Sequence, residues 1–197
     1  MFGKFIIKIL GWKINWTLPE EVYKKCVIIA APHTSNWDYP IAIAAMSALG
    51  VKLKYTIKDQ MMRPPYGWFF RMMGGIGVDR RPKKKNDSRL SLVDAIAQLF
   101  KRYEKLSVIV QAEGTRSLRA HWKTGFYYIA LKAKVPIALG YLDYQEKIAG
   151  IGKLIYPTGD MEKDMLEIME FYKDIPGKWP EKFTLDERFY PPKNPTS

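Results

Sequence analysis

The chain has 197 residues, 47% of them hydrophobic and 26% charged, so it is long enough to bury the core of a single domain, and wholesale disorder is excluded. Its one cysteine, Cys26, and its two histidines, His33 and His121, exclude an intrachain disulfide and argue against a Cys- or His-built metal centre. A net charge of +12 predicts a polyanionic partner, and aromatic residues at 14% favour an anionic membrane surface over nucleic acid.

The N-terminal stretch 1–12 is apolar, with Lys4 and Lys8 one helical turn apart. We expect a short helix that lies on a membrane surface and turns these lysines toward lipid phosphates, so residues 1–18 form an interfacial segment. The alternative is a helix that packs on the protein's own core. The side chains expected to face acyl chains are Phe5, Ile6 and Ile9.

Charged residues interrupt every apolar run, so no segment is expected to span a bilayer. The N-terminus lacks the features of a secretory signal peptide. These observations predict a cytoplasmic protein that associates peripherally with the cytoplasmic face of a membrane.

Strand-like and helix-like segments alternate in the first half of the chain. Apolar runs predict strands over 25–31, 51–57 and 75–79. A helix is expected over 39–49, and a short helix opened by proline and closed by glycine over 64–74.

The same alternation continues in the second half. After a basic loop at 82–86, Ser88 is expected to cap a helix that runs to Tyr103. The later predicted elements are a strand over 107–112, a helix over 124–133, paired strands over 135–144 and 148–156, a helix over 160–172 and an irregular tail from 176. We therefore predict one α/β domain over 1–197, with a mostly parallel central sheet flanked by helices on both faces and an antiparallel part near 140–156.

His33 directly follows the first buried strand, and Asp38 stands five residues later at the start of a helix. A strand–turn–helix connection can bring the two side chains together, so that the carboxylate orients the imidazole as a general base. Capping is the alternative: Asp38 before Tyr39 and Pro40 suits a helix N-cap, and Ser35 with Asp38 suits a capping box.

The nucleophile that a base of this kind would serve is not obvious in the chain. Ser35 lies near His33 but no G-x-S-x-G turn surrounds it, and Cys26 within an apolar strand is expected to pack in the core. A base without a protein nucleophile favours activation of a substrate hydroxyl.

Basic residues gather beside two glycine-containing turns, as expected of a phosphate pocket, although solvated surface loops are the alternative. Glu113, at a strand end, is expected to pair with one of the arginines. The basic residues at these turns are Arg80, Arg81, Arg116, Arg119 and Lys123.

Four blocks of the chain together resemble the glycerophospholipid acyltransferase family, the lysophosphatidic-acid-acyltransferase-like enzymes. The first block is a histidine, four residues and an aspartate, His33-Thr-Ser-Asn-Trp-Asp38. The others are Gly74-Gly-Ile-Gly-Val-Asp-Arg80, Glu113-Gly-Thr-Arg116 and Val135-Pro-Ile-Ala-Leu139. Together the four blocks make a strong resemblance, because they occur in the family's order over about residues 30 to 140.

The resemblance implies that His33 deprotonates an acceptor hydroxyl, with Asp38 orienting it. The hydroxyl then attacks the thioester of an acyl-CoA or acyl-carrier protein, without an acyl-enzyme, a metal or a cofactor. By the same matching, the acceptor's phosphate or polar head is bound by Arg80, Glu113, Gly114, Thr115 and Arg116. Backbone near Val135 and Pro136 is implied to support the donor or its acyl chain.

The predicted function is therefore O-acyl transfer to a lysophospholipid such as 1-acylglycerol-3-phosphate, in phospholipid biosynthesis. An acyltransferase for a different hydroxylated lipid is one alternative. A non-catalytic basic protein that binds anionic lipid or nucleic acid is the other. It explains the charge but not the coupling of the His33 and Glu113 blocks, and nucleic acid is not expected as a partner because no docking motif is present.

Overall fold

A computed structural model describes residues 2–15, 18–19, 24–51, 53–72, 74–78 and 91–191 of the chain. Its centre is a sheet in which every neighbouring pair of strands is parallel except β6 with β7, which is antiparallel. The strand order is β1 (Lys13–Asn15), β7 (Ile148–Ile155), β6 (Ile137–Asp143), β2 (Lys25–Ala30), β5 (Leu106–Val110), β3 (Leu53–Lys58) and β4 (Gly75–Val78). The predicted fold class and its antiparallel part are confirmed.

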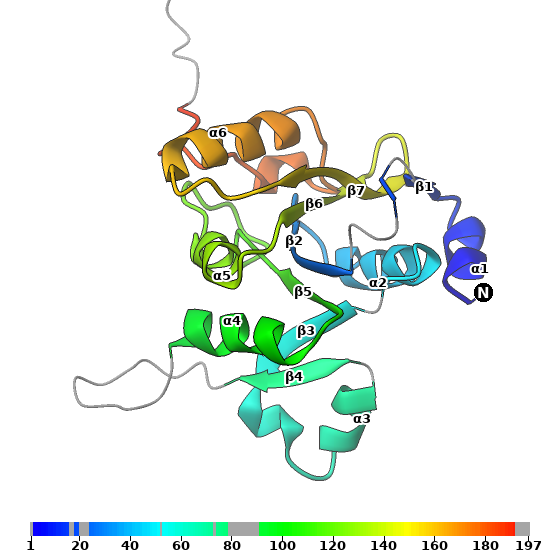
Figure 1. The fold of residues 1–197 in the computed structure, drawn as a ribbon. Coiled ribbons are helices and arrows are strands. Elements are labelled where there is room, and N and C mark those ends of the chain that lie inside the picture. Colours follow the sequence, from blue (N-terminus) through cyan, green and yellow to red (C-terminus); the bar gives the residue numbers. More distant parts are fainter. Residues whose placement is uncertain are drawn as a thin grey trace, which may run out of the picture.

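Helices cover both faces of the sheet, so the domain has three layers (Figure 1). One face carries α1 (Phe2–Ile9) and α2 (Asp38–Ala48). The opposite face carries α4 (Leu92–Arg102), α5 (Gly125–Ala133) and α6 (Met161–Tyr172). The 3-10 turn η2 (Asp59–Met62) and the short helix α3 (Gly67–Met72) follow β3 at the β4 edge of the sheet. The 3-10 turn η3 (Pro180–Lys182) follows α6.

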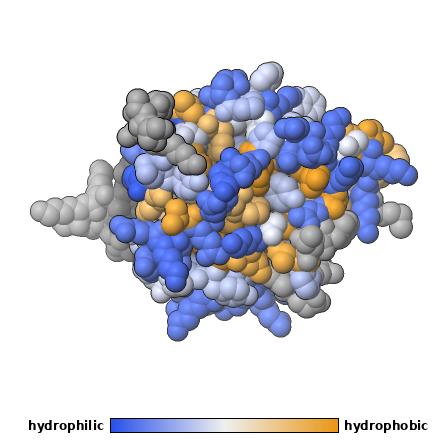
Figure 2. Space-filling view, turned by 90° about the horizontal axis from the view of Figure 1, so that it is seen from above, coloured by the Kyte–Doolittle hydropathy of each residue, from blue (hydrophilic) through white to orange (hydrophobic). Residues whose placement is uncertain are grey.

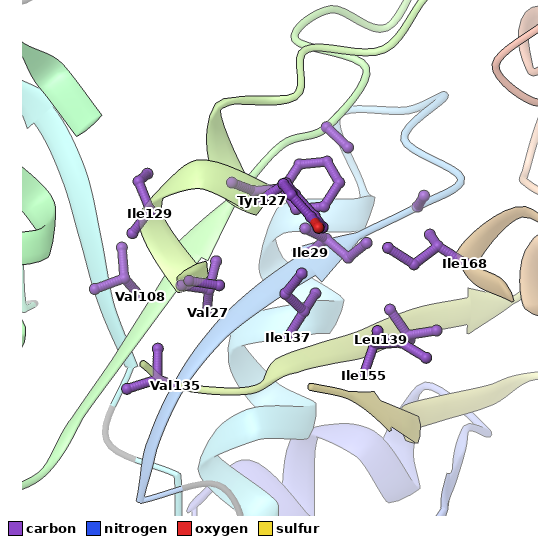
Figure 3. Close-up of a cluster of buried hydrophobic side chains, with 14 of the residues drawn as sticks. Val27, Ile29, Val108, Tyr127, Ile129, Val135, Ile137, Leu139, Ile155 and Ile168 are labelled. Atoms are coloured by element: carbon purple, nitrogen blue, oxygen red, sulfur yellow. The ribbon is translucent and has the colours of Figure 1, made fainter. Parts of the chain in front are cut away.

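Strand β2 shows why the sequence folds in this way, because its side chains are buried on both faces. Val27 and Ile29 point toward α5 and α6 (Figure 3), whereas Cys26 and Ile28 pack on the α2 side. Fully burying a side chain of the Val or Ile type stabilises the folded state by about 1.5–3 kcal/mol. A continuous apolar run therefore takes the central place in a covered sheet.

Helix α1 forms where it was expected and also packs on the core. Ile7 is buried among the residues of the α2 face, and Ile6 packs partly against them. Phe5 and Ile9 remain 63% and 67% exposed. The alternative of a helix packed on its own protein therefore accounts for one face of α1, and Ile6 does not face outward as expected.

The helix ends refine the sequence predictions. The N-cap of α4 is Ser91, whose Oγ accepts a hydrogen bond from the amide of Asp94 at 3.1 Å. The predicted cap, Ser88, lies outside the described residues, as does the basic loop at 82–86. Asp160, the first residue of the predicted helix, is the N-cap of α6 and accepts a hydrogen bond from the amide of Lys163 at 3.1 Å.

The C-terminal segment is mostly irregular, as predicted, but it is tied to the core. The carboxylate of Asp186 is buried and accepts a hydrogen bond from the amide of Trp122 at 2.9 Å. Arg188 donates to the same carboxylate at 2.6 Å. Burial would raise the pKa of Asp186, but the hydrogen bonds from Arg188 and from the amide of Trp122 outweigh it and lower that pKa.

On the face shown in Figure 2, hydrophobic residues show between hydrophilic ones. Among the described residues, no helix combines the length and apolar character needed to cross a bilayer.

Candidate functional site

The candidate site lies at the carboxyl ends of three adjacent parallel strands. Ile29 of β2 pairs with Val110 of β5, and Ala30 of β2 pairs with Gly140 of β6. The segments that follow these strands therefore emerge at the same edge of the sheet, which is where open α/β folds place their ligands.

His33 and Asp38 are brought together on the loop that follows β2. Nδ1 of His33 lies 3.1 Å from Oδ2 of Asp38, and the two residues are only 5% and 4% exposed. A carboxylate at this distance fixes the proton on Nδ1 and leaves Nε2 free to accept a proton from a substrate. The geometry expected of an oriented general base is present.

Asp38 is not the N-cap of α2, because that position is occupied by Trp37 without a side-chain cap. Oδ2 of Asp38 instead accepts hydrogen bonds from the amides of Thr34 at 2.9 Å and Ser35 at 2.8 Å. Of the two hydrogen bonds of the expected capping box, the one from the amide of Ser35 to the carboxylate of Asp38 is therefore formed. Oγ of Ser35 accepts a hydrogen bond from the amide of Trp37 at 3.1 Å.

The charge of Asp38 is held by donors that outweigh its burial. Burial alone would raise the pKa of this carboxyl, but the hydrogen bonds from His33, Tyr144 and the amide of Ser35 lower it. The carboxylate is therefore ionised at neutral pH and keeps the imidazole in place.

Tyr144, just after β6, is a member of this site that sequence reasoning missed. Its Oη donates a hydrogen bond to Oδ1 of Asp38 at 2.6 Å. Burial, together with the adjacent Asp38, raises the pKa of this phenol far above its ordinary range, so it remains a donor. The signal in the sequence was the polar end of an otherwise apolar strand, Gly140-Tyr-Leu-Asp-Tyr144.

Glu113 contacts the backbone of His33 and not an arginine as expected. Its Oε1 accepts a hydrogen bond from the amide of His33 at 2.6 Å. Burial raises the pKa of Glu113 to about 7, the hydrogen bond from His33 works in the opposite direction, and the charge of Asp38 raises it further. Strand pairing explains why Glu113 contacts His33: β2 and β5 are neighbours, so the loops that follow these two strands lie side by side.

The turn after Glu113 brings a different cation to the site. Gly114 has a φ of +71°, a conformation that favours glycine, and a Cβ built on it would lie 2.8 Å from Nζ of Lys123. The amide of Lys123 donates to the carbonyl of Ala112 at 2.7 Å, which closes the loop. Lys123, one of the basic residues expected at these turns, thus lies beside Gly114.

The two described arginines of the predicted phosphate pocket do not line the cavity. Arg116 and Arg119 are exposed, and Oγ1 of Thr115 accepts a hydrogen bond from the amide of Ser117 at 3.3 Å. Arg80 and Arg81 lie outside the described residues.

A cavity of about 570 Å³ opens beside His33 and Asp38. Gly114 and Lys123 line it, whereas Arg116 does not. Its apolar walls come from both faces of the sheet and include Ala42, Met46, Ile109, Ile96, Phe126 and Ile129. A polar end with a base and an ammonium, joined to apolar walls, suits a substrate with a charged head and a hydrocarbon chain.

The expected absence of a protein nucleophile at Cys26 and Ser35 agrees with their surroundings. Cys26 is fully buried, and burial raises the pKa of its thiol to about 12. Ser35 is buried, with its hydroxyl engaged by the amide of Trp37. Neither side chain is prepared to attack a substrate.

Val135 and Pro136 stand at the end of β6 opposite to the end that reaches His33. The amide of Val135 donates to the carbonyl of Ala130 at 3.1 Å, and the carbonyl of Pro136 accepts from the amide of Val27 at 3.0 Å. These backbone groups therefore serve the end of α5 and the edge of the sheet, and it is the other end of β6 that supplies Tyr144.

The C-terminal segment passes over the His33 loop. The amide of Trp179 donates to Oγ1 of Thr34 at 3.2 Å, and the amide of Tyr144 donates to the carbonyl of Pro176 at 3.3 Å. A Cβ on Gly177 would come within 2.9 Å of Oγ1 of Thr34, so glycine permits this close approach. The segment holds the loop from outside.

A protein-family model described as Acyltransferase matches residues 13–138, well over half of the chain. The chain belongs to the acyltransferase family. The matched range of this acyltransferase contains His33, Asp38, Gly114 and Lys123, which line the cavity, and Glu113, which holds the backbone of His33. It stops short of Tyr144 and of the segment around Gly177.

The fold is similar to a crystal structure of the 1-acyl-sn-glycerophosphate (LPA) acyltransferase PlsC from Thermotoga maritima. The TM-score is 0.57 at 17% sequence identity, and the match covers 87% of this chain and 74% of that one. None of the curated proteins matches the chain in sequence. At this identity the structural match shows the fold, and the substrates of this acyltransferase have to be argued from its own site.

Proposed function

We propose that this acyltransferase moves a fatty acyl group from an acyl-CoA or acyl-carrier-protein thioester to the hydroxyl of a lysophospholipid such as 1-acylglycerol-3-phosphate, in phospholipid biosynthesis. The observation that carries the proposal is the buried pair of His33 and Asp38, 3.1 Å apart, at the polar end of a cavity with apolar walls. The similarity to an LPA acyltransferase supports the choice of acceptor.

In the proposed reaction, Nε2 of His33 takes the proton of the acceptor hydroxyl as its oxygen attacks the thioester carbonyl carbon. The carbon–sulfur bond then breaks, the ester forms, and the thiolate leaves with the proton that His33 had taken. Asp38 keeps the imidazole in one tautomer and stabilises the transient imidazolium. No protein nucleophile, metal or cofactor enters these steps.

Recognition of the acceptor's phosphate is proposed for the turn after β5. Lys123 and the backbone of Gly114 line the cavity, and we retain Thr115, Arg116 and Arg80 as proposed contacts on the family resemblance. Glu113 contributes by holding the backbone of His33. Fixed cations favour a dianionic phosphate in a partly desolvated pocket.

We further propose that the protein works at the cytoplasmic face of an anionic membrane, bound peripherally, and does not bind nucleic acid. Besides Phe5 and Ile9 on α1, the region of α3 leaves large apolar side chains exposed beside Arg63 and Arg71. They are Tyr66, Trp68, Phe69 and Met72. Aromatic residues with nearby cations are typical of a membrane interface.

A thioester-release assay with acyl-CoA, and separately with acyl-carrier protein, tests the function. We expect release of the free thiol to depend on the lysophospholipid, and product ester to form in equal amount. Thiol release without any dependence on an acceptor would indicate a thioesterase. A lack of turnover with all donor–acceptor pairs, under conditions in which the protein binds anionic vesicles, would favour a non-catalytic lipid-binding protein.

A further inference from the structure

We propose that Tyr144 is a positioning residue of the acyl-transfer reaction, which acts on His33 through Asp38. Resting on the proposed function, the inference extends the site to a residue beyond the range of the family match.

The two carboxylate oxygens of Asp38 accept hydrogen bonds from different donors. Oδ2 is used by Nδ1 of His33 and by the amides of Thr34 and Ser35. Oδ1 has its donor in Tyr144, at 2.6 Å. The phenol therefore determines how the carboxylate is rotated, and the rotation determines where Oδ2 meets the imidazole.

Tyr144 is itself held from two sides. The ring of Trp12, just after α1, packs edge-on against its ring, with centroids 5.0 Å apart and planes at 88°. Its amide donates to the carbonyl of Pro176 in the C-terminal segment. A phenol fixed in this way can orient a carboxylate without losing much rotational freedom itself.

The hydroxyl of Tyr144 also stabilises the negative charge of Asp38. A buried carboxylate oxygen that loses its donor leaves part of its charge unsolvated, and the pKa of the carboxyl then rises. An Asp38 that accepts a proton no longer accepts the Nδ1–H of His33. The loss of one hydroxyl is thus transmitted to the base, although Tyr144 does not touch the substrate.

Other groups around Asp38 also titrate, and the experiment has to separate them from Tyr144. Besides Tyr144, the titratable groups that interact with Asp38 are His33 and Glu113, and Tyr39 and Lys178 lie on the segments beside it. All of them remain in the variant described next, so a change in the pH profile reports on the hydroxyl of Tyr144.

The test is Tyr144→Phe, which removes the hydroxyl and keeps the ring against Trp12. We expect kcat to fall about 10- to 100-fold, the range of a lost charge-assisted hydrogen bond, with KM for both substrates within about twofold. The acidic limb of the pH profile of kcat/KM should move to higher pH, because Asp38 becomes easier to protonate.

Tyr127→Phe is the matched control, since Oη of Tyr127 donates to Oδ2 of the buried Asp164 at 2.8 Å between α5 and α6. It removes the same kind of hydrogen bond outside the site. We expect a lower Tm with kcat and the pH profile unchanged. If the two variants lose activity to the same degree, with no change in the pH profile of Tyr144→Phe, Tyr144 is a structural tyrosine and the proposal is overturned.

A spectroscopic readout makes the inference independent of the assay. With two histidines, protein labelled with ¹⁵N-histidine should give two sets of imidazole signals, and His121→Gln assigns them. We expect His33 in the Nδ1–H tautomer, and an altered Nδ1–H resonance in Tyr144→Phe but not in Tyr127→Phe. An unaltered resonance would overturn the positioning role even if acyl transfer is found. An altered one supports the role even if the proposed substrates fail.

Discussion

Two loops at the same edge of the sheet each carry a buried carboxylate, and they treat it in opposite ways. Asp38, where the loop after β2 enters α2, has donors in His33, Thr34 and Ser35 of that loop and in Tyr144 after β6, and its pKa is lowered. The loop after β5 gives Glu113 the amide of His33, and its pKa is raised to about 7. The number of donors, and not burial itself, decides which carboxylate keeps its charge.

Asp38 can therefore stabilise a positive charge on His33. Glu113, which is largely neutral below pH 7, instead holds the backbone of His33 as a hydrogen-bond acceptor. The difference also prevents two buried negative charges from meeting around one imidazole. Substitutions around this edge of the sheet would break or sharpen the contrast.

The largest effect is expected for His33→Ala. Loss of a general base lowers kcat by about 10²–10⁴-fold, whereas the protein should still fold and show a thermal transition, because Thr34, Ser35 and Tyr144 still donate to Asp38. Thioester turnover and thermal melting measure the two quantities. His121→Ala is the control, since this side chain is exposed and outside the site, and near-wild-type turnover in His33→Ala would refute the mechanism.

Glu113→Gln should change how stability depends on pH, because glutamine keeps the acceptor oxygen but cannot ionise. Glu113 has its pKa raised from 4.5 to about 7, so the folded state holds a proton that the unfolded state releases. The stability from this proton is fully present below pH 4.5 and is lost as the pH rises through 7. The wild type should therefore lose about 3 kcal/mol of unfolding free energy relative to the variant between pH 4.5 and 8.

Urea unfolding of both proteins at each pH measures this difference. Asp38→Asn serves as the comparison, because the pKa of Asp38 is lowered and its contribution is instead lost at acid pH, as the pH falls through that lowered pKa. Parallel stability curves for the wild type and Glu113→Gln from pH 4.5 to 8 would contradict the assignment.

Lys123→Ala should weaken use of a phosphorylated acceptor. An ammonium in contact with phosphate contributes roughly 1.5–3 kcal/mol, so kcat/KM falls about 10- to 100-fold, chiefly through KM. Arg116→Ala should cost less, because an exposed guanidinium acts in water. Initial rates with phosphorylated and phosphate-free acceptors measure both variants, and equal losses on the two acceptors would exclude phosphate recognition.

The smallest effect is expected for Lys8→Ala at the membrane. A single cation near an anionic surface contributes about 1 kcal/mol, or roughly fivefold in vesicle binding. Sedimentation with anionic and neutral vesicles at low and high salt measures it. Lys163→Ala on α6 is the control, and equal binding of the wild type to both vesicle types would remove the electrostatic part of the membrane proposal.

Much of the fold follows from local patterns. Val27 to Ile29 form an apolar run that only a sheet covered on both faces can bury, and the later segments repeat the alternation of strand and helix. Helix starts were less predictable, because Ser88 and Ser91 suit a cap equally well by residue type. The family blocks located His33, Asp38 and Glu113 at one edge before any geometry was available.

The contacts within the site could not be predicted in the same way. Asp38 orients His33 and also accepts a hydrogen bond from Tyr144, 106 residues away, a contact that no local pattern predicts. Glu113 has arginines nearby in the sequence, yet its hydrogen bond is made with a residue 80 positions earlier, through strand register. Lys123 reaches the cavity because the loop after β5 closes on itself.

The wide spacing of these contacts has a consequence for how the protein is made. Thr34 is held by Trp179, 145 residues later, and the parallel strands around β2 pair across comparable separations. Such long-range contacts form slowly, and during synthesis they wait for residues 176–179 to leave the ribosome. Nascent chains that end before residue 176 should therefore lack an ordered His33 loop, and activity should be acquired only once these residues have emerged.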